Sequence, residues 1–256
     1  MTYLTKAKIA TFIKQNIPDF HRKRLESLAG LKLERVLSRK NPYLFKAKNL
    51  VTAEQLVRQL LDAHLSSQEE TVFGDFLEYL AIHACGLAFS GRKSNAEGID
   101  LEFDRDGTRY IVSIKSGPNW GNSSQIKKMR DYFRQAQKIF GHKRLLIAVN
   151  GCCYGRDSKP NKGDYLKLCG QSFWELVSGE PAMYQEIVEP IGYMAKQRND
   201  EFENEYAKVV NRFTGEFLER FCCADGAIDW ECVVAFESAT LQPSREICKC
   251  MWKLSS

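Results

Sequence analysis

The 256-residue sequence lacks the patterns of several protein classes. Its nine cysteines include no Cys-x-x-Cys pair, and Cys248-x-Cys250 is too tight for the usual zinc knuckle. Its longest apolar runs, such as residues 145–149, are far shorter than the roughly 20 residues that a membrane span needs. The N-terminus carries Lys6, Lys8 and Lys14 among its apolar residues, unlike a secretory signal. We therefore expect reduced, mostly buried thiols, no membrane span and a cytoplasmic location.

Composition and charge favour a folded protein with a polyanionic partner. With 44% hydrophobic and 11% aromatic residues, the chain can bury a substantial core. The net charge of +5 is unevenly spread. Residues 1–50 hold twelve Lys/Arg against three acids and residues 122–144 hold seven against one, whereas residues 201–240 hold nine acids against three bases. Such basic regions suit the phosphates of a nucleic acid, although solvated helix faces produce the same pattern.

The hydrophobic periodicity predicts a mixed α/β (α+β) fold. Helical spacing marks residues 5–40, with a break near Pro18, and residues 52–65 after a Thr52 cap. A capping box at Ser67 predicts a further helix that ends near Gly86. After Gly91 the pattern turns to strand, strand, helix (about 124–140) and strand (about 144–151), which implies a mixed sheet. Helices follow at about 172–178, 183–197 and 200–221, and the segment CVVAF suits one more strand.

The two strands after Gly91 form a predicted hairpin. Asp106-Gly107 between alternating segments is a strong signal for a type I′ turn. A two-residue loop pairs Arg105 with Thr108, so Asp100 faces Ser113 across the strands. Because side chains alternate, one face carries Asp100, Ser113 and Lys115. We expect the other face to bury five apolar side chains: Ile99, Leu101, Phe103, Val112 and Ile114.

Asp100, followed by Ser113-Ile114-Lys115 and the loop SGPNWGNSS, resembles the PD-(D/E)XK nuclease superfamily. The segment SIKSGPNWGNSSQ is similar to Type II restriction endonucleases that cut sites with a degenerate GG-N-CC core. The resemblance covers about residues 78–150 and implies a mixed-sheet nuclease core flanked by helices. It also implies Mg²⁺-dependent hydrolysis of double-stranded DNA in a bacterial cytoplasm. A cognate DNA methyltransferase is the genetic partner expected of a restriction-modification system.

The chemistry of phosphodiester hydrolysis explains these residue types. A hard divalent cation polarises the phosphoryl oxygen and activates the attacking water, and oxygen ligands suit Mg²⁺. The resemblance makes Asp100 a metal ligand and the backbone carbonyl of Ile114 a second one. The Lys115 ammonium would orient the water and offset developing charge. Without the surrounding motif, alternating acids on a strand are more simply its solvated side.

Ser113 stands where the family usually has an acid, and a hydroxyl is a much poorer Mg²⁺ ligand than a carboxylate. Three acids could supply the missing charge. We rank Glu78, on the helix before the hairpin, first as both catalytic residue and metal ligand. Asp131 on the following basic helix comes second. Glu102 comes third, because strand rise places it roughly 7 Å from Asp100.

The loop and helix after Lys115 supply the predicted DNA contacts. Polar side chains at the start of that helix could take phosphate oxygens. Basic side chains along the helix could follow the backbone or reach guanine edges. The predicted contacts are Asn119, Asn122, Ser123, Ser124, Lys127, Lys128, Arg130 and Arg134, with Arg156, Lys159, Asn161 and Lys162 as a second surface.

We expect one endonuclease domain over residues 1–256. It would comprise a helical region at 1–66, a catalytic core at 67–170 and a helical dimerisation region at 171–256. A palindromic site is matched by a two-fold symmetric protein, so the resemblance implies a homodimer. Two rivals stay open: a repair or recombination nuclease with the same core, and a DNA-binding relative whose nuclease site has decayed.

Overall fold

The computed structural model describes residues 3–140 and 145–240, which form two compact units. The first, which we call the sheet unit, comprises the chain up to Phe20 together with Glu70–Ala195. The second, the helical unit, comprises His21–Glu69 and the chain from Lys196. The predicted grouping of the whole chain in one endonuclease domain stays a prediction.

The sheet unit contains a five-stranded mixed sheet in the order β1-β2-β3-β4-β5. The pairs β1–β2 and β2–β3 are antiparallel, and β3–β4 and β4–β5 are parallel. A parallel neighbour requires a crossover, which the helix between β3 and β4 provides. The strands are β1 (Arg92–Lys93), β2 (Leu101–Arg105), β3 (Thr108–Lys115), β4 (Leu145–Cys152) and β5 (Leu166–Cys169). The predicted mixed α+β class is therefore confirmed.

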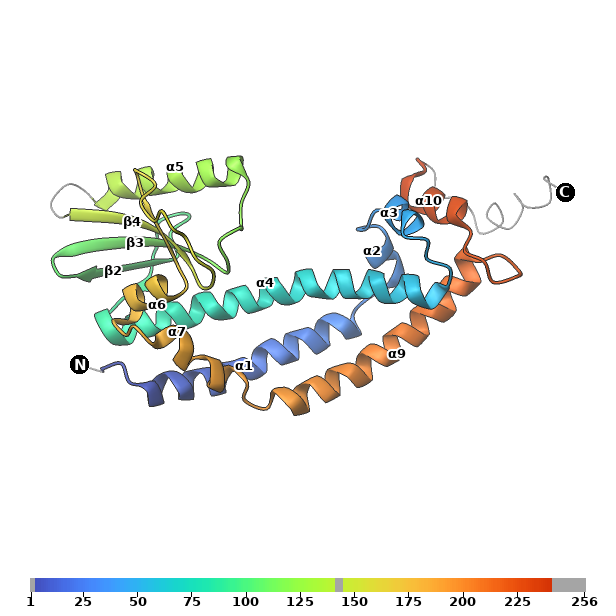
Figure 1. The fold of residues 1–256 in the computed structure, drawn as a ribbon, viewed down its shortest axis with the longest axis horizontal. Helices are drawn as coiled ribbons and strands as arrows, with labels where there is room; N and C mark the ends of the chain where they lie inside the picture. The colour runs from blue at the N-terminus through green and yellow to red at the C-terminus, as the bar shows by residue number, and fades with distance from the viewer. Residues whose placement is uncertain (1–2, 141–144, 241–256) are drawn as a thin grey trace. The chain divides into compact units, whose positions relative to one another are not determined.

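Helices cover both faces of this sheet (Figure 1). The crossover helix α5 (Ser123–Phe140) packs Met129 and Phe133 on one face. On the other face, apolar side chains of β2 and β3 join those of three helices, α1 (Lys6–Ala29), α4 (Ala53–Phe89) and α6 (Gln171–Ser178). The short helices α7 (Met183–Glu186) and α8 (Val188–Ile191) border the same cluster. Coverage on both sides holds the ends of β2 and β3 in place.

The predicted hairpin is confirmed with its register. Arg105 pairs with Thr108, and Asp104 pairs with Arg109. Both turn residues have positive φ, 51° at Asp106 and 75° at Gly107, as a type I′ turn requires. One detail of the faces was wrong: Ile99 packs under α5 and not with Leu101, because it precedes β2 and lies outside the strand alternation.

The helical unit has a separate apolar core. The longer helix α9 (Ala195–Phe221) contributes Phe213 and Phe217, which are buried in the same apolar cluster as Leu60 and Leu61 of α4. Short helices complete the unit: α2 (Leu33–Leu37), α3 (Pro42–Ala47) and α10 (Trp230–Ser238). The predicted strand CVVAF is in fact part of α10, whose first turn is capped by the Asp229 side chain. β-Branched residues favoured a strand, but this cap and the packing of Val233 favour the helix.

Several predicted helix boundaries are also wrong. The helix predicted at 5–40 ends at Ala29, the one predicted at 183–197 is divided into α7 and α8, and α9 begins at Ala195 instead of near residue 200. Helix α1 continues through Pro18, which removes one backbone hydrogen bond, while buried Ile13 and Ile17 hold the helix to the core. Helix α4 runs without interruption past Ser67 and Gly86. The Ser67 hydroxyl donates to the Ala63 carbonyl inside the helix and caps no new one. The predicted Thr52 cap is confirmed by its bond from Gln55 N.

Cysteine states match the expectation at most of the described positions. Within residues 3–140 and 145–240, six cysteines are free thiols, and four of these are buried: Cys85, Cys152, Cys153 and Cys169. Cys232 instead forms a disulfide, so the expectation of reduced thiols was wrong there.

Within the described residues, α4 is long and apolar enough to cross a membrane by length and composition alone. One such helix is weak evidence, because the core helix of a soluble protein passes the same test. Apolar side chains of α4 contribute to the cores of both units, including Leu60, Leu80 and Ala84. These contacts account for the apolar character of α4.

The core of the sheet unit can be tested at Trp174 of α6. This side chain is 1% exposed, and its Nε1 donates to the Cys153 carbonyl at 2.8 Å. We expect Trp174→Ala to lower the free energy of unfolding by about 3–5 kcal/mol, through lost burial and an unpaired carbonyl. Urea unfolding followed by circular dichroism measures the change. The control Ile139→Ala, at a side chain 72% exposed, should stay within about 0.5 kcal/mol. Equal losses in both variants would contradict this description of the core.

Candidate active site

Asp100 and Lys115 meet at one end of the hairpin. Asp100 directly precedes β2, and Lys115 is the last residue of β3. The Lys115 Nζ lies 3.8 Å from Asp100 Oδ2. Both side chains are partly exposed, at 30% for Lys115 and 23% for Asp100. The two groups therefore face the same side of the sheet and are open to solvent.

The neighbouring backbone and hydroxyl hold the Asp100 carboxylate. Ile114 N donates to Asp100 Oδ2 at 2.6 Å, and Ser113 Oγ donates to the same oxygen at 3.4 Å. Ser113 is buried, 3% exposed. Among the described residues, no partner of Asp100 Oδ1 is found, so this oxygen can take an external ligand. Ser113 thus orients the carboxylate by hydrogen bonding.

The Ile114 carbonyl points to the same side of β3 as the Asp100 carboxylate. In a β-strand the N–H and C=O of one residue point to the same side. Because Ile114 N donates to Asp100, the Ile114 carbonyl also points toward the Asp100 side of β3. β2 begins only at Leu101, so this carbonyl lies beyond the last ladder pair, Leu101 with Val112.

Glu78 on α4 is the second acidic group of this site. A Cβ at Gly74 would lie 3.6 Å from the Ser116 Cβ, so this face of α4 approaches the end of β3. Glu78 follows one turn later on the same face. Burial raises the pKa of Glu78, and the nearby Asp100 carboxylate raises it further, while Lys93 and Lys115 oppose the shift. Lys93 Nζ lies 3.8 Å from Glu78 Oε1.

The raised pKa of Glu78 predicts a stability cost at neutral pH. The Glu78 carboxyl binds its proton more tightly in the folded chain than in the unfolded chain, where its pKa is near the ordinary value of 4.5. Stability from this group is therefore lost as the pH rises from that value through the folded pKa. In metal-free buffer we expect Glu78→Gln to raise the Tm at pH 7 and to leave it nearly unchanged at pH 4.

Thermal unfolding at the two pH values measures this difference. Glu70→Gln, at an exposed acid of the same helix, is the control and should change the Tm at neither pH. If Glu78→Gln shifted the Tm equally at pH 4 and pH 7, the burial of the Glu78 charge would be contradicted.

The other two candidate acids are engaged elsewhere. Glu102 is 5% exposed and bonded to Arg92 at 2.7 Å and to the Ser94 hydroxyl at 3.1 Å. Asp131 pairs with Arg134 at 2.7 Å on the surface of α5. Of the three acids ranked from the sequence, Glu78 is the one that the fold brings to Asp100 and Lys115.

Trp120 contacts Lys115, and Asn150 in turn binds Trp120. The Lys115 Nζ lies 5.3 Å from the centre of the Trp120 ring. Trp120 Nε1 donates to Asn150 Oδ1 at 3.1 Å, and Asn150 Nδ2 donates to the Ser113 carbonyl at 3.3 Å. The sequence interpretation missed Asn150. Asn150 is recognised only from the parallel pairing of β4 with β3, which places it opposite Ser113. That pairing cannot be known until the strand order is known.

The donor set fits a hard divalent cation. It consists of carboxylate oxygens of Asp100 and Glu78 and the carbonyl oxygen of Ile114, the ligand type that Mg²⁺ prefers. Among the described residues, no group of three or more His, Cys, Asp or Glu side chains could hold a metal ion. Such a site would therefore depend on two carboxylates, a main-chain carbonyl, water and substrate phosphate, as is usual for Mg²⁺.

The predicted DNA contacts divide into free and paired side chains. Asn119, Ser123 and Lys127 are exposed, and Asn122 caps α5 through its bond from Gln125 N at 3.0 Å. Lys128 Nζ lies 5.5 Å from the Tyr132 ring centre. Two arginines are paired with acids, Arg130 with Asp164 at 2.7 Å and Arg134 with Asp131.

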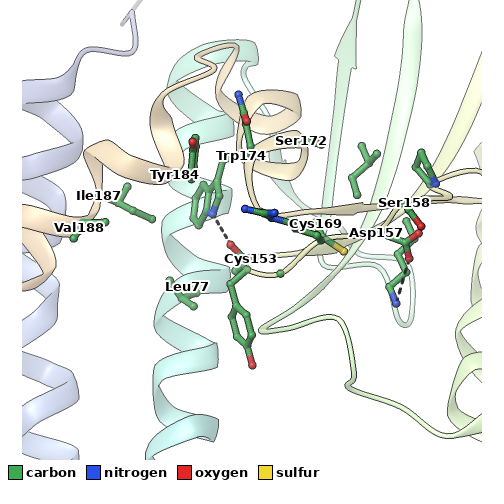
Figure 2. Close-up of a pocket in the computed structure, with 18 of the residues that line it drawn as sticks. Leu77, Cys153, Asp157, Ser158, Cys169, Ser172, Trp174, Tyr184, Ile187 and Val188 are labelled. Atoms are coloured by element: carbon green, nitrogen blue, oxygen red, sulfur yellow. Dashed lines mark hydrogen bonds and ion pairs between the residues drawn. The ribbon is translucent and has the colours of Figure 1, made fainter.

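The second predicted surface borders a pocket of about 740 Å³ in the sheet unit (Figure 2). Arg156 lines the pocket, together with Trp174, Tyr184 and Leu77. Lys159, Asn161 and Lys162 do not line it, and Lys162 pairs with Asp157 at 2.9 Å. Neither Asp100, Lys115 nor Glu78 lines it. The acidic site lies at exposed strand ends outside this pocket, which suits a wide substrate.

Comparison with known proteins identifies the family. Residues 7–199 match the family model described as Type II restriction endonuclease EcoO109I. No curated protein matches the chain. The matched segment is well over half of the chain and includes the whole sheet with Glu78, Asp100 and Lys115. The chain is therefore a DNA-binding Type II endonuclease and belongs to the EcoO109I family of restriction endonucleases.

Proposed function

We propose that the protein is a Mg²⁺-dependent, site-specific endonuclease of the PD-(D/E)XK type that cuts both strands of DNA. The observation that carries this proposal is the 3.8 Å approach of Lys115 Nζ to Asp100 Oδ2 at the solvent-accessible ends of β2 and β3, with Glu78 nearby. A carboxylate pair with a nearby ammonium supplies both a cation site and a group for the phosphate. From the sequence similarity of the segment SIKSGPNWGNSSQ, the proposed recognition site has a degenerate GG-N-CC core.

In this mechanism each group of the chain has a distinct role. Asp100 Oδ1, Glu78 and the Ile114 carbonyl would hold Mg²⁺, which when bound lowers the pKa of a coordinated water and stabilises the phosphoryl charge. Ser113 Oγ and Ile114 N bind Asp100 Oδ2, which leaves Oδ1 for the cation. The Lys115 ammonium donates to the attacking water or to the non-bridging phosphate oxygen. Positioned charges of this kind act without reorganisation during the reaction.

The exposed polar end of α5 supports DNA contact next to this site. Asn119, Ser123 and Lys127 are free to meet phosphates, and Lys127 adds a positive charge. Arg130 and Arg134 contribute once DNA displaces their acidic partners Asp164 and Asp131. Arg156, at the pocket, forms a second contact surface.

The assembly and setting complete the proposal. A duplex site with two-fold symmetry is met by a homodimer, with its interface in the helical region that follows residue 171. A cognate methyltransferase would protect the host DNA. The enzyme would act in the bacterial cytoplasm, where the DNA lies.

Incubation of the protein with plasmid DNA and Mg²⁺, followed by sequencing of the fragment ends, tests this function. We expect discrete fragments that share one sequence motif, and no cleavage in EDTA. Structure-dependent nicking would favour a repair nuclease. Binding without cleavage would favour a decayed site, which the Ser113 substitution alone could produce.

A further inference from the structure

We propose that Trp120 and Asn150 are positioning residues for Lys115: Asn150 fixes the indole ring, and the ring holds the ammonium over the reaction site. This inference rests on the proposed nuclease function. It concerns residues outside the acid and lysine motif, and it explains how the chain places its lysine although Ser113 carries no charge.

Asn150 is the rigidly held anchor for the Trp120 ring. It lies in β4, is 1% exposed and pairs with Ser113 in the parallel register. A buried amide is costly unless it is hydrogen-bonded, and here both ends are used. Its Nδ2 donates to the Ser113 carbonyl, so its Oδ1 is directed at the Trp120 Nε1. The orientation of the indole is thus set from the middle of the sheet.

Trp120 carries this orientation to Lys115. The residue lies in the loop between β3 and α5, where a side chain without a hydrogen bond would sample several rotamers. The bond to Asn150 selects one, and the ring face then lies 5.3 Å from Lys115 Nζ. An ammonium over an indole face is attracted by the ring quadrupole.

Two groups therefore attract the Lys115 ammonium. Its Nζ lies 5.3 Å from the centre of the Trp120 ring and 3.8 Å from Asp100 Oδ2. Ordering a free lysine costs rotamer entropy, which would add to the barrier if it were lost only when DNA binds. A neighbouring carboxylate two residues earlier would usually help to hold the lysine, but here that position is the neutral Ser113. The aromatic face supplies the missing attraction.

Three substitutions separate this role from simple loop packing. Trp120→Leu keeps an apolar side chain but removes the π face, whereas Trp120→Phe keeps a ring and loses the N–H. Asn150→Ala removes the anchor. We expect Trp120→Leu to lower the single-turnover cleavage rate about tenfold, the other two variants to lower it less, and the Kd for DNA to stay constant. The control Phe140→Leu removes a ring near Arg109 at the other end of the hairpin and should leave the rate unchanged.

A spectroscopic measurement tests the contact without cleavage. Reductive methylation with ¹³C-formaldehyde keeps the lysine charge and labels each lysine for NMR. We expect the methyl signal of Lys115, assigned by its absence in Lys115→Arg, to be shifted upfield by the indole ring. The shift should vanish in Trp120→Leu and decrease in Asn150→Ala.

The two readouts distinguish the possible failures. A Lys115 signal at the position of exposed lysines in the wild type would overturn the positioning role, even if the enzyme cleaves DNA. A tenfold loss shared by Trp120→Leu and Phe140→Leu would also overturn it. An upfield signal in a protein that cuts no DNA would support the contact and contradict the nuclease function alone.

Discussion

Replacing Lys115 with alanine should reduce the single-turnover rate of DNA cleavage by about 10²–10⁴-fold, the range typical of a positioned proton-transfer or charge-stabilising group. Lys115→Ala removes the ammonium that lies 3.8 Å from Asp100 while the hairpin register stays unchanged. Because the acids and the α5 contacts remain, the Kd for DNA should change by less than about threefold. Quench-flow cleavage and fluorescence anisotropy measure the two quantities.

Lys196→Ala provides the matched control. Lys196 is an exposed lysine of α9 that pairs with Asp200 at 3.0 Å, a surface contact worth little. Its removal should alter neither the rate nor the Kd. If Lys115→Ala cut DNA at the rate of this control, the role of the ammonium in the chemistry would be excluded.

The substitution Asp100→Asn should have an effect as large. The amide oxygen can still accept the Ile114 N–H, so the local fold is kept, but the charge that attracts a cation is lost. We expect the cleavage rate at about 10 mM Mg²⁺ to fall by at least about 100-fold, because a neutral amide is a much poorer ligand for Mg²⁺ than a carboxylate. Isothermal titration calorimetry should register weaker binding of the ion as well.

Asp104→Asn controls for a lost acid on the same hairpin. Asp104 forms a two-bond pair with Arg109 at 2.8 and 2.9 Å, away from the strand ends that carry the site. This variant should lose a little stability and no cleavage. Equal cleavage by Asp100→Asn and Asp104→Asn would remove Asp100 from the reaction.

The local parts of the fold and site follow from the sequence. Asp106-Gly107 sets the turn, the turn sets the register, and the register brings Asp100 to the strand that carries Lys115. Alternation then places both side chains on one face. The predicted crossover helix and the strand after it also agree with α5 and β4. Each of these steps depends on residues close in the chain.

The parts that depend on distant contacts could not be predicted. Nothing near Pro18 or Ser67 signals that tertiary packing keeps α1 and α4 continuous. β1 is a two-residue strand, and β5 is defined by its pairing with β4, so local pattern alone is insufficient for either. The helix at CVVAF forms because Asp229 caps it and the helical core accepts Val233.

The same reasoning applies to the site. The ranking of Glu78 above Asp131 and Glu102 rests on the family resemblance, in which the preceding helix often carries an acid that points into the site. The approach of Gly74 to Ser116 supplies a physical basis for it. Asn150 could not be assigned, because its role depends on β4 lying beside β3 and on the Trp120 loop folding back. Long-range pairing therefore determines the supporting residues, whereas the hairpin determines the central pair.

We expect Asp100, Glu78 and the Ile114 carbonyl to form one cation site beside Lys115. Anomalous diffraction from crystals soaked in Mn²⁺, which accepts the oxygen ligands of Mg²⁺, would locate the ion. We predict a peak at about 2.0–2.2 Å from an Asp100 carboxylate oxygen and from the Ile114 carbonyl, lost in Asp100→Asn crystals. A peak bound instead by Glu102 or Asp131, or none at Asp100, would contradict the claim.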